Sequence, residues 1–288
     1  MKKELLKYCL FIGILVTLTN NASAKSTIID EVTDLAEIGI LAKQDNAKVG
    51  KTLIVFDIDD TLLEANHFVG SDKWYNWQKG RASFDPKGQP VTINPSEEYG
   101  CISSLLSTFF ELGSTHLTQA NTVEIVNSLR AFDLIMLTAR TTSYRIPTER
   151  ELSRFKLDFS DEHLLEKNVG MIFDLNDGRR TAKVTYQNGV VLSSGLNKGL
   201  VLAEVLSRAN KQYDYIYFID DSRKNIKLMH EAWQNKGALV RNLHYTRVDK
   251  SISQSEITQS NEIKQQLDEF IQTAYPERAK IFAEGRCQ

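Results

Sequence analysis

The chain has 288 residues, of which 42% are hydrophobic and 25% charged, and its formal net charge at pH 7 is −2. This length is sufficient for one large domain or for a domain with an insertion. The near-neutral balance gives no reason to expect nucleic acid or an anionic membrane as a partner.

Residues 1–24 have the pattern of a secretory signal peptide. Three lysines precede a short apolar run at residues 10–18, and Ala22-Ser23-Ala24 forms an A-x-A cleavage site. The alternative is an uncleaved membrane anchor, although the apolar run is too short to span a bilayer comfortably. We therefore expect a periplasmic or secreted bacterial protein that begins at Lys25 and makes no membrane contact after cleavage. Losing three lysines and Glu4 with the leader would change the net charge from −2 to −4.

The next segments predict a helix, a strand and an inserted unit. Residues 28–43 carry a helical stripe of apolar side chains. Residues 53–56 are continuously apolar, which predicts a strand buried on both faces of a parallel sheet. This strand ends in Asp57, Asp59 and Asp60, and a buried strand tolerates such acids only with a metal, a proton or a partner. Ligands bind outside the carboxyl ends of the strands in open α/β sheets. The alternative interpretation is an acidic turn at the surface.

A cap insertion is expected at residues 68–117, because the next core strand begins only near residue 134. Trp74, Tyr75 and Trp77 in this segment favour a small core of the cap itself, with the lining of a pocket as the alternative. Cys101 lies in the same insertion and Cys287 near the C-terminus. The two thiols either form a disulfide or remain unpaired.

The second half of the chain alternates between predicted helices and strands. Thr148 and Glu151 form a plausible capping box for a helix that runs to about residue 157. Asn188-Gly189 is a strong hairpin signal. We further expect helices at residues 121–132, 198–206, 223–236 and 255–274, the last packing on the core, and strands at 134–137, 215–219 and 239–246.

Polar groups follow three of the predicted strands. They are Asp57 and Asp59, then Thr138, then the pair Asp220 and Asp221, while Lys198 opens the helix that leads to the last of these strands. Parallel strands bring such groups to one edge of the sheet. Converging carboxylates repel one another, and all-oxygen ligands favour Mg²⁺. A carboxylate nucleophile attacking a phosphoryl group needs this charge neutralised, while a lysine and a hydroxyl hold the remaining oxygens.

These residues resemble, in order, the four motifs of the haloacid dehalogenase (HAD) superfamily of phosphohydrolases. The first is Asp57-Ile58-Asp59-Asp60-Thr61, and Thr138, Lys198-Gly199 and Asp220-Asp221-Ser222 follow. The chain is similar to secreted bacterial acid phosphatases of that superfamily or to an uncharacterised secreted branch. The resemblance implies an α/β fold with a Rossmann-like three-layer α/β/α core, a parallel sheet and an inserted cap. The core would comprise residues 25–67 and 118–288.

The resemblance also implies the role of each site residue. Asp57 would be the nucleophile and Asp59 the general acid and base, and Thr138 and Lys198 would bind the phosphate of a small phosphorylated substrate. Mg²⁺ would be bound by Asp57, the backbone carbonyl of Asp59, and Asp221, with Asp220 as a ligand or close to one.

Two neighbouring residues have open roles at this stage. Arg140 is either a further phosphate contact or a surface salt bridge. Asn225 stands where many relatives have an aspartate, so its role near the metal is undefined.

Each site residue also has an ordinary structural explanation, and the expected function has two rivals. Thr138 can cap a turn, Lys198 can be a solvated lysine, and Asp221-Ser222 can be an ordinary N-cap. The expected function is a secreted Mg²⁺-dependent phosphomonoesterase acting through an aspartyl-phosphate. The rivals are a non-catalytic binding or effector protein on the same fold, and a phosphotransferase that uses an alcohol acceptor.

Overall fold

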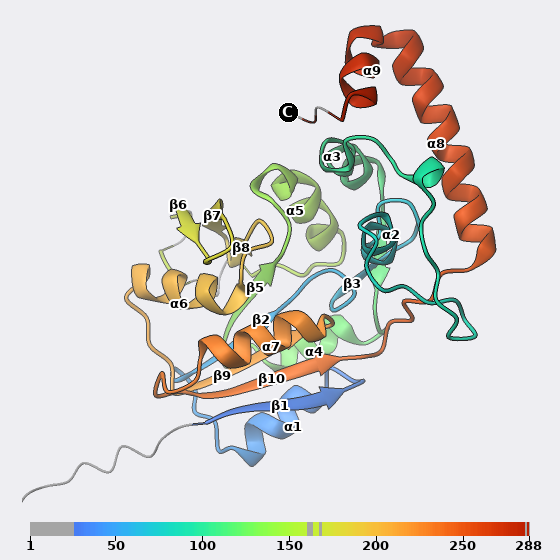
Figure 1. Cartoon of the computed structure of the whole chain (residues 1–288). Helices are drawn as coiled ribbons and strands as arrows, with labels where there is room; N and C mark the ends of the chain where they lie inside the picture. The colour runs from blue at the N-terminus through green and yellow to red at the C-terminus, as the bar shows by residue number, and fades with distance from the viewer. Residues whose placement is uncertain (1–25, 160–163, 167–168, 286, 288) are drawn as a thin grey trace, which may run out of the picture.

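The computed structural model describes residues 26–159, 164–166, 169–285 and 287, and its centre is an eight-stranded sheet (Figure 1). The strand order is β1-β10-β9-β2-β5-β8-β7-β6. Neighbouring strands from β1 to β8 in this order are parallel, and β7 and β6 are antiparallel additions at one edge. The strands are β1 (Thr27–Val32), β2 (Thr52–Phe56), β5 (Asp133–Thr138), β6 (Met171–Asn176), β7 (Thr181–Gln187), β8 (Val190–Leu192), β9 (Tyr215–Asp220) and β10 (Leu239–Tyr245).

Helices cover both faces of this sheet, because the central strands are apolar on both sides. In β2, Ile54 and Phe56 face one cluster and Leu53 and Val55 the other. The first cluster is covered by α1 (Glu37–Gln44), α4 (Thr122–Ser128) and α5 (Arg145–Arg154), and the second by α6 (Lys198–Arg208) and α7 (Arg223–Ala232). The predicted Rossmann-like three-layer α/β/α core is therefore confirmed.

A cap leaves the sheet after β2. The short antiparallel pair β3 (Leu63–Ala65) and β4 (Thr115–Leu117) forms its base. Between them lie α2 (Asp72–Gln78), the 3₁₀ turn η1 (Pro95–Glu97) and α3 (Ile102–Leu112). Trp74 and Trp77 are buried, and Trp74 makes edge-to-face contacts with Tyr99 and Phe109, so the aromatic run forms the core of the cap as predicted. The exact limits 68–117 stay a prediction.

The C-terminal helices pack on the cap. α8 (Gln254–Ala274) buries Ile257 in the aromatic cluster of the cap, and α9 (Pro276–Ala283) adds Phe282 (Figure 1). The helix expected at residues 255–274 is confirmed, but the prediction that it packs on the core is wrong. The narrow apolar stripe of α8 packs on aromatic side chains of the insertion, and the sequence of α8 alone does not indicate this partner.

Three other local predictions differ from the structure. Residues 28–32 belong to β1, since Thr27, Ile28 and Val32 are β-branched and pair with β10, and only α1 is helical. The capping box is also absent: α5 already begins at Arg145, and the Thr148 hydroxyl donates to the Tyr144 carbonyl. The helix expected at 223–236 ends as α7 at Ala232.

The remaining predicted elements form, including the hairpin. Asn188 and Gly189 both have positive φ and join antiparallel β7 and β8. The predicted signal peptide, residues 1–24, lies outside the described residues. Within the described ranges, no helix combines the length and apolarity needed to cross a bilayer.

The disulfide between Cys101 and Cys287 closes a loop of 186 residues and ties the C-terminus to the start of α3. Of the two alternatives for these thiols, the structure has the bonded one. We expect Cys287→Ser to lower the free energy of unfolding by about 2–4 kcal/mol, because the bond restricts the unfolded chain. Urea unfolding with and without reductant is the measurement. A reductant effect that persists in the variant would contradict the prediction.

Candidate active site

The turn after β2 presents its acids at the carboxyl edge of the sheet. The Asp57 N–H donates to the Ile219 carbonyl of β9 over 2.9 Å, which continues the strand pairing up to the first acid. Leu62 and Leu63 N–H groups then both donate to the Ile58 carbonyl, so the chain reverses at once. Asp60 has φ of +56°, a left-handed conformation that aspartate tolerates better than most residues. This tight turn keeps the acids at the strand tip.

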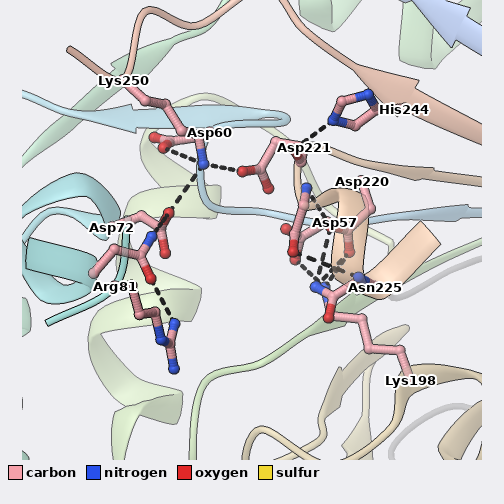
Figure 2. Close-up of polar contacts among 12 residues, drawn as sticks. Asp57, Asp60, Asp72, Arg81, Lys198, Asp220, Asp221, Asn225, His244 and Lys250 are labelled. Atoms are coloured by element: carbon pink, nitrogen blue, oxygen red, sulfur yellow. Dashed lines mark hydrogen bonds and ion pairs between the residues drawn. The ribbon is translucent and has the colours of Figure 1, made fainter. Parts of the chain in front are cut away.

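Lys198 connects the acids of two strands (Figure 2). Its Nζ donates to Asp57 Oδ1 over 2.6 Å and to Asp220 Oδ2 over 2.7 Å, and all three side chains are buried. Asn197 caps α6 through its side chain, so Lys198 occupies the first helical position. At Gly199, an added Cβ would lie 2.6 Å from the Ala232 Cβ and 3.0 Å from the Met229 Cα. The missing side chain therefore lets α6 pack closely on α7 and places Lys198 between the two acids.

Burial and charge set the protonation of this group. Burial raises the pKa of Asp57 well above its usual range, Asp220 and Asp221 raise it further, and Lys198 opposes the shift. Burial lowers the pKa of Lys198, but Asp220 and Asp57 raise it by more, so the lysine remains an ammonium. The lysine is therefore a fixed positive charge inside the site.

Asp59 lies two residues after Asp57, but its partner is an arginine and not Lys198. Arg140 holds it in a two-point ion pair, with Nε to Oδ2 at 2.9 Å and Nη2 to Oδ1 at 2.7 Å. Burial raises the pKa of Asp59, and Arg140 lowers it by more, so the carboxyl is ionised. The guanidinium also donates to Thr148 Oγ1 and stacks 4.2 Å from the Phe110 ring of the cap. Of the two predicted roles of Arg140, the salt bridge is observed, though buried.

Two further residues support the strand tips. Thr138 ends β5 next to β2, and its buried hydroxyl accepts the Arg140 N–H within the same turn. Asn225 Nδ2 lies 3.1 Å from both carboxylate oxygens of Asp220, which the Ser222 N–H also contacts. Asn225 thus orients Asp220 toward Lys198.

A second lysine, missed by the sequence analysis, contacts three more acids (Figure 2). Lys250 Nζ lies 3.0 Å from Asp72 Oδ2 and 3.2 Å from Asp60 Oδ2, and it also pairs with Asp221. Burial raises the pKa of Asp60 to about 8 and that of Asp221 to about 7, and Lys250 opposes both shifts. Lys250 lies in the loop after β10 and belongs to no sequence motif, and no residue spacing links it to the strand tips. Only the folded chain brings it there.

We expect Lys250→Met to lower the free energy of unfolding by about 1–3 kcal/mol, because three acids lose their shared cation. Urea unfolding measures the loss, and added Mg²⁺ should reduce it by neutralising the same acids. Lys264→Met is the matched control, since Lys264 pairs with Asp268 within α8 and contacts none of these three acids. Equal losses in the two variants would contradict the prediction.

The donor set fits a divalent cation. Oxygens of Asp57, Asp220 and Asp221 lie within 4.8 Å of one another, and Asp60, Asp72 and Asp221 form a second such group. Both groups offer only oxygen, the donor that Mg²⁺ prefers. The side chain of Asp59 belongs to neither group, which leaves its backbone carbonyl as the candidate ligand predicted for that residue.

The site therefore combines converging acids and two lysines at the carboxyl edge of a Rossmann-like α/β sheet, under a cap. The chain belongs to the family described as "Protein of unknown function (DUF2608)", which matches residues 31–283.

Among solved structures, the chain is similar to a HAD-superfamily hydrolase, subfamily IA, variant 1, from Geobacter sulfurreducens PCA. The identity is 14% and the TM-score 0.35, and the match covers 68% of this chain and 93% of that chain. No curated protein matches. The function must therefore be argued from the residues of the site.

Proposed function

We propose that this protein is a Mg²⁺-dependent phosphomonoesterase that acts through an aspartyl-phosphate on Asp57. The observation that carries the proposal is the contact of Lys198 with both Asp57 and Asp220 at the tips of adjacent strands. Burying two acids with one lysine is unfavourable for a purely structural purpose, and such arrangements cluster at functional sites. The proposal includes secretion to the periplasm or beyond, on the strength of the N-terminal sequence.

The residues divide the reaction into two steps. In the first, a carboxylate oxygen of Asp57 attacks phosphorus, the bond from phosphorus to the ester oxygen breaks, and Asp59 in its acid form protonates the leaving alcohol. In the second, Asp59 takes a proton from water as the water attacks phosphorus. The bond to Asp57 then breaks and releases inorganic phosphate.

Positive charge supports both steps. Lys198 and the Thr138 hydroxyl would bind the non-transferred phosphoryl oxygens, whose charge must be neutralised as Asp57 approaches. Asp57, Asp220, Asp221 and the Asp59 carbonyl would hold Mg²⁺. Bound there, the cation would neutralise the acids and the phosphoryl charge.

The ion pair with Arg140 restricts Asp59. The ionised carboxylate is the form of a base, which suits the second step, whereas the first step needs a proton on it. Leaving groups of low pKa, such as phenolates, depart without that proton. Aryl phosphates should therefore be better substrates than alkyl phosphates.

The test is hydrolysis of a generic aryl phosphate by the purified protein, with Mg²⁺ and with a chelator. Metal-dependent phosphate release supports the proposal. Mg²⁺ binding without turnover on a broad panel of phosphoesters would favour the non-catalytic rival. A phosphorylated alcohol formed when an alcohol is added would identify the phosphotransferase.

A further inference from the structure

A group of basic side chains at the candidate site has no role in the mechanism proposed above. Arg81 follows α2 in the cap, Arg179 lies in the β6–β7 turn, and Lys224 is in the first turn of α7. All three are exposed. They come from three distant parts of the chain, so no local sequence pattern accounts for their meeting.

A hydrogen-bonded turn places Arg179 next to the catalytic groups, and its position in the chain places Lys224 there. Asp177 accepts the Asn197 N–H over 3.0 Å while pairing with Arg179, which fixes the β6–β7 turn against the residue before Lys198. Lys224 immediately precedes Asn225, whose amide contacts Asp220.

The third residue comes from the cap side. Arg81 donates to Asn76, whose amide in turn donates to Asp72 over 2.8 Å (Figure 2). Asp72 is the acid through which the cap reaches Lys250. Arg81 is therefore linked through two hydrogen-bonded side chains to the acids of the site.

Arg179 and Arg81 both exert electrostatic repulsion on Lys224. Burial lowers the pKa of Lys224, and the positive charges of Arg179 and Arg81 lower it further. Asp177 offsets part of this charge, since it pairs with Arg179. In the described part of the chain, neither Arg81 nor Lys224 has a carboxylate within ion-pair distance. The group thus keeps a net positive charge that nothing in the described fold neutralises.

We propose that Arg81, Arg179 and Lys224 bind a second anionic group on the substrate, so that the preferred substrates are phosphomonoesters with a further phosphate or carboxylate on the leaving group. This rests on the proposed function and names its substrate class. We call Arg81, Arg179 and Lys224 the basic rim. A positively charged rim attracts an anionic ligand and raises its rate of association, most strongly at low salt. The shared chemistry is an anion, and the substrate probes below distinguish phosphate from carboxylate.

The experiment compares substrates that differ only in the second group. The kcat/KM is measured for monophosphates of straight-chain diols of increasing length, for the bisphosphates of the same diols, and for the matching carboxylate-bearing alkyl phosphates. In the wild type, the best substrate with a second anionic group should exceed the diol monophosphate of the same length by about tenfold at low salt. The triple variant Arg81→Gln, Arg179→Gln, Lys224→Gln should lose this preference and keep its rate on the diol monophosphates, which have no second anionic group.

Matched charge removal provides the control. Lys43, Lys51 and Lys211 lie at the opposite edge of the sheet, beside the amino ends of β2 and β9, and their triple replacement by Gln should keep the preference. A wild type without preference, or a preference that survives in the rim variant, would overturn the proposal.

Binding separates this proposal from the proposed function. Calorimetric titration of Asp57→Asn with the bisphosphates, with and without the rim substitutions, needs no turnover. If no phosphoester is hydrolysed, the phosphatase assignment fails. The rim proposal then stands only if its substitutions still weaken bisphosphate binding by about tenfold, and falls if they do not.

Discussion

Replacing Asp57 with asparagine is expected to lower kcat for phosphoester hydrolysis by at least about 10⁴-fold, to the background of the assay. The amide has nearly the shape of the carboxylate, so the contact from Lys198 to Oδ1 persists. An amide oxygen is a poor nucleophile toward phosphorus. The covalent intermediate on Asp57 is therefore not formed.

The same substitution should not destabilise the fold. Burial raises the pKa of Asp57, which means that its ionised form is unfavourable in the folded protein. Removing that charge leaves Lys198 paired with Asp220. We therefore expect an unchanged or higher free energy of unfolding, measured in urea beside the kinetics.

The control for Asp57→Asn is Asp30→Asn, which removes an aspartate that pairs with Arg241 and lies on β1, three strands away from β2 in the sheet. It should keep the wild-type kcat. Residual turnover of Asp57→Asn near the wild-type level would exclude Asp57 as the nucleophile and with it the aspartyl-phosphate route.

The core and most of its site follow from local patterns in the sequence. Continuous apolar runs mark β2, β5 and β9, and each is followed by its polar group, so the approach of Asp57, Lys198 and Asp220 is predictable from parallel strand order. The predictions fail where contacts between distant parts of the chain determine the local structure. β1 is a strand because β10 offers it an edge, and α8 packs on the cap because aromatic side chains of the insertion are exposed to it.

The site itself shows the same limit. Lys250 belongs to no motif, and its role depends on a loop that the cap holds in place: the Ile252 N–H donates to the Phe84 carbonyl, and Lys73 donates to the Ser251 carbonyl. The partner of Asp59 could not be chosen from the sequence either. Arg140 lies two residues after Thr138, a spacing equally compatible with a phosphate contact.

Lys198→Met is the substitution with the largest expected effect on stability. It removes the cation between two buried acids, and breaking a buried pair in this way costs about 3–5 kcal/mol of unfolding free energy. Met has a similar length and keeps the apolar part of the packing. The loss therefore reports charge and hydrogen bonding, not a cavity.

The pH dependence of this loss has a definite sign. With Lys198 gone, burial and the charge of Asp220 keep the pKa of Asp57 above the value of about 3.9 expected in the unfolded chain. Between these two pKa values the folded state binds more protons than the unfolded state, so stability falls as pH rises. The loss caused by Lys198→Met should be larger at pH 8 than at pH 5.

Urea unfolding of the wild type, Lys198→Met and the double variant Lys198→Met, Asp57→Asn at both pH values tests this account. The double variant has one acid fewer to leave unpaired, so it should recover part of the loss, and the recovery should be larger at pH 8. A loss below about 1 kcal/mol, or equal losses at both pH values, would mean that Lys198 is not the cation that makes the buried acids tolerable. In that case another positive charge, with Lys250 the nearest candidate through Asp221, would have to neutralise the nucleophile.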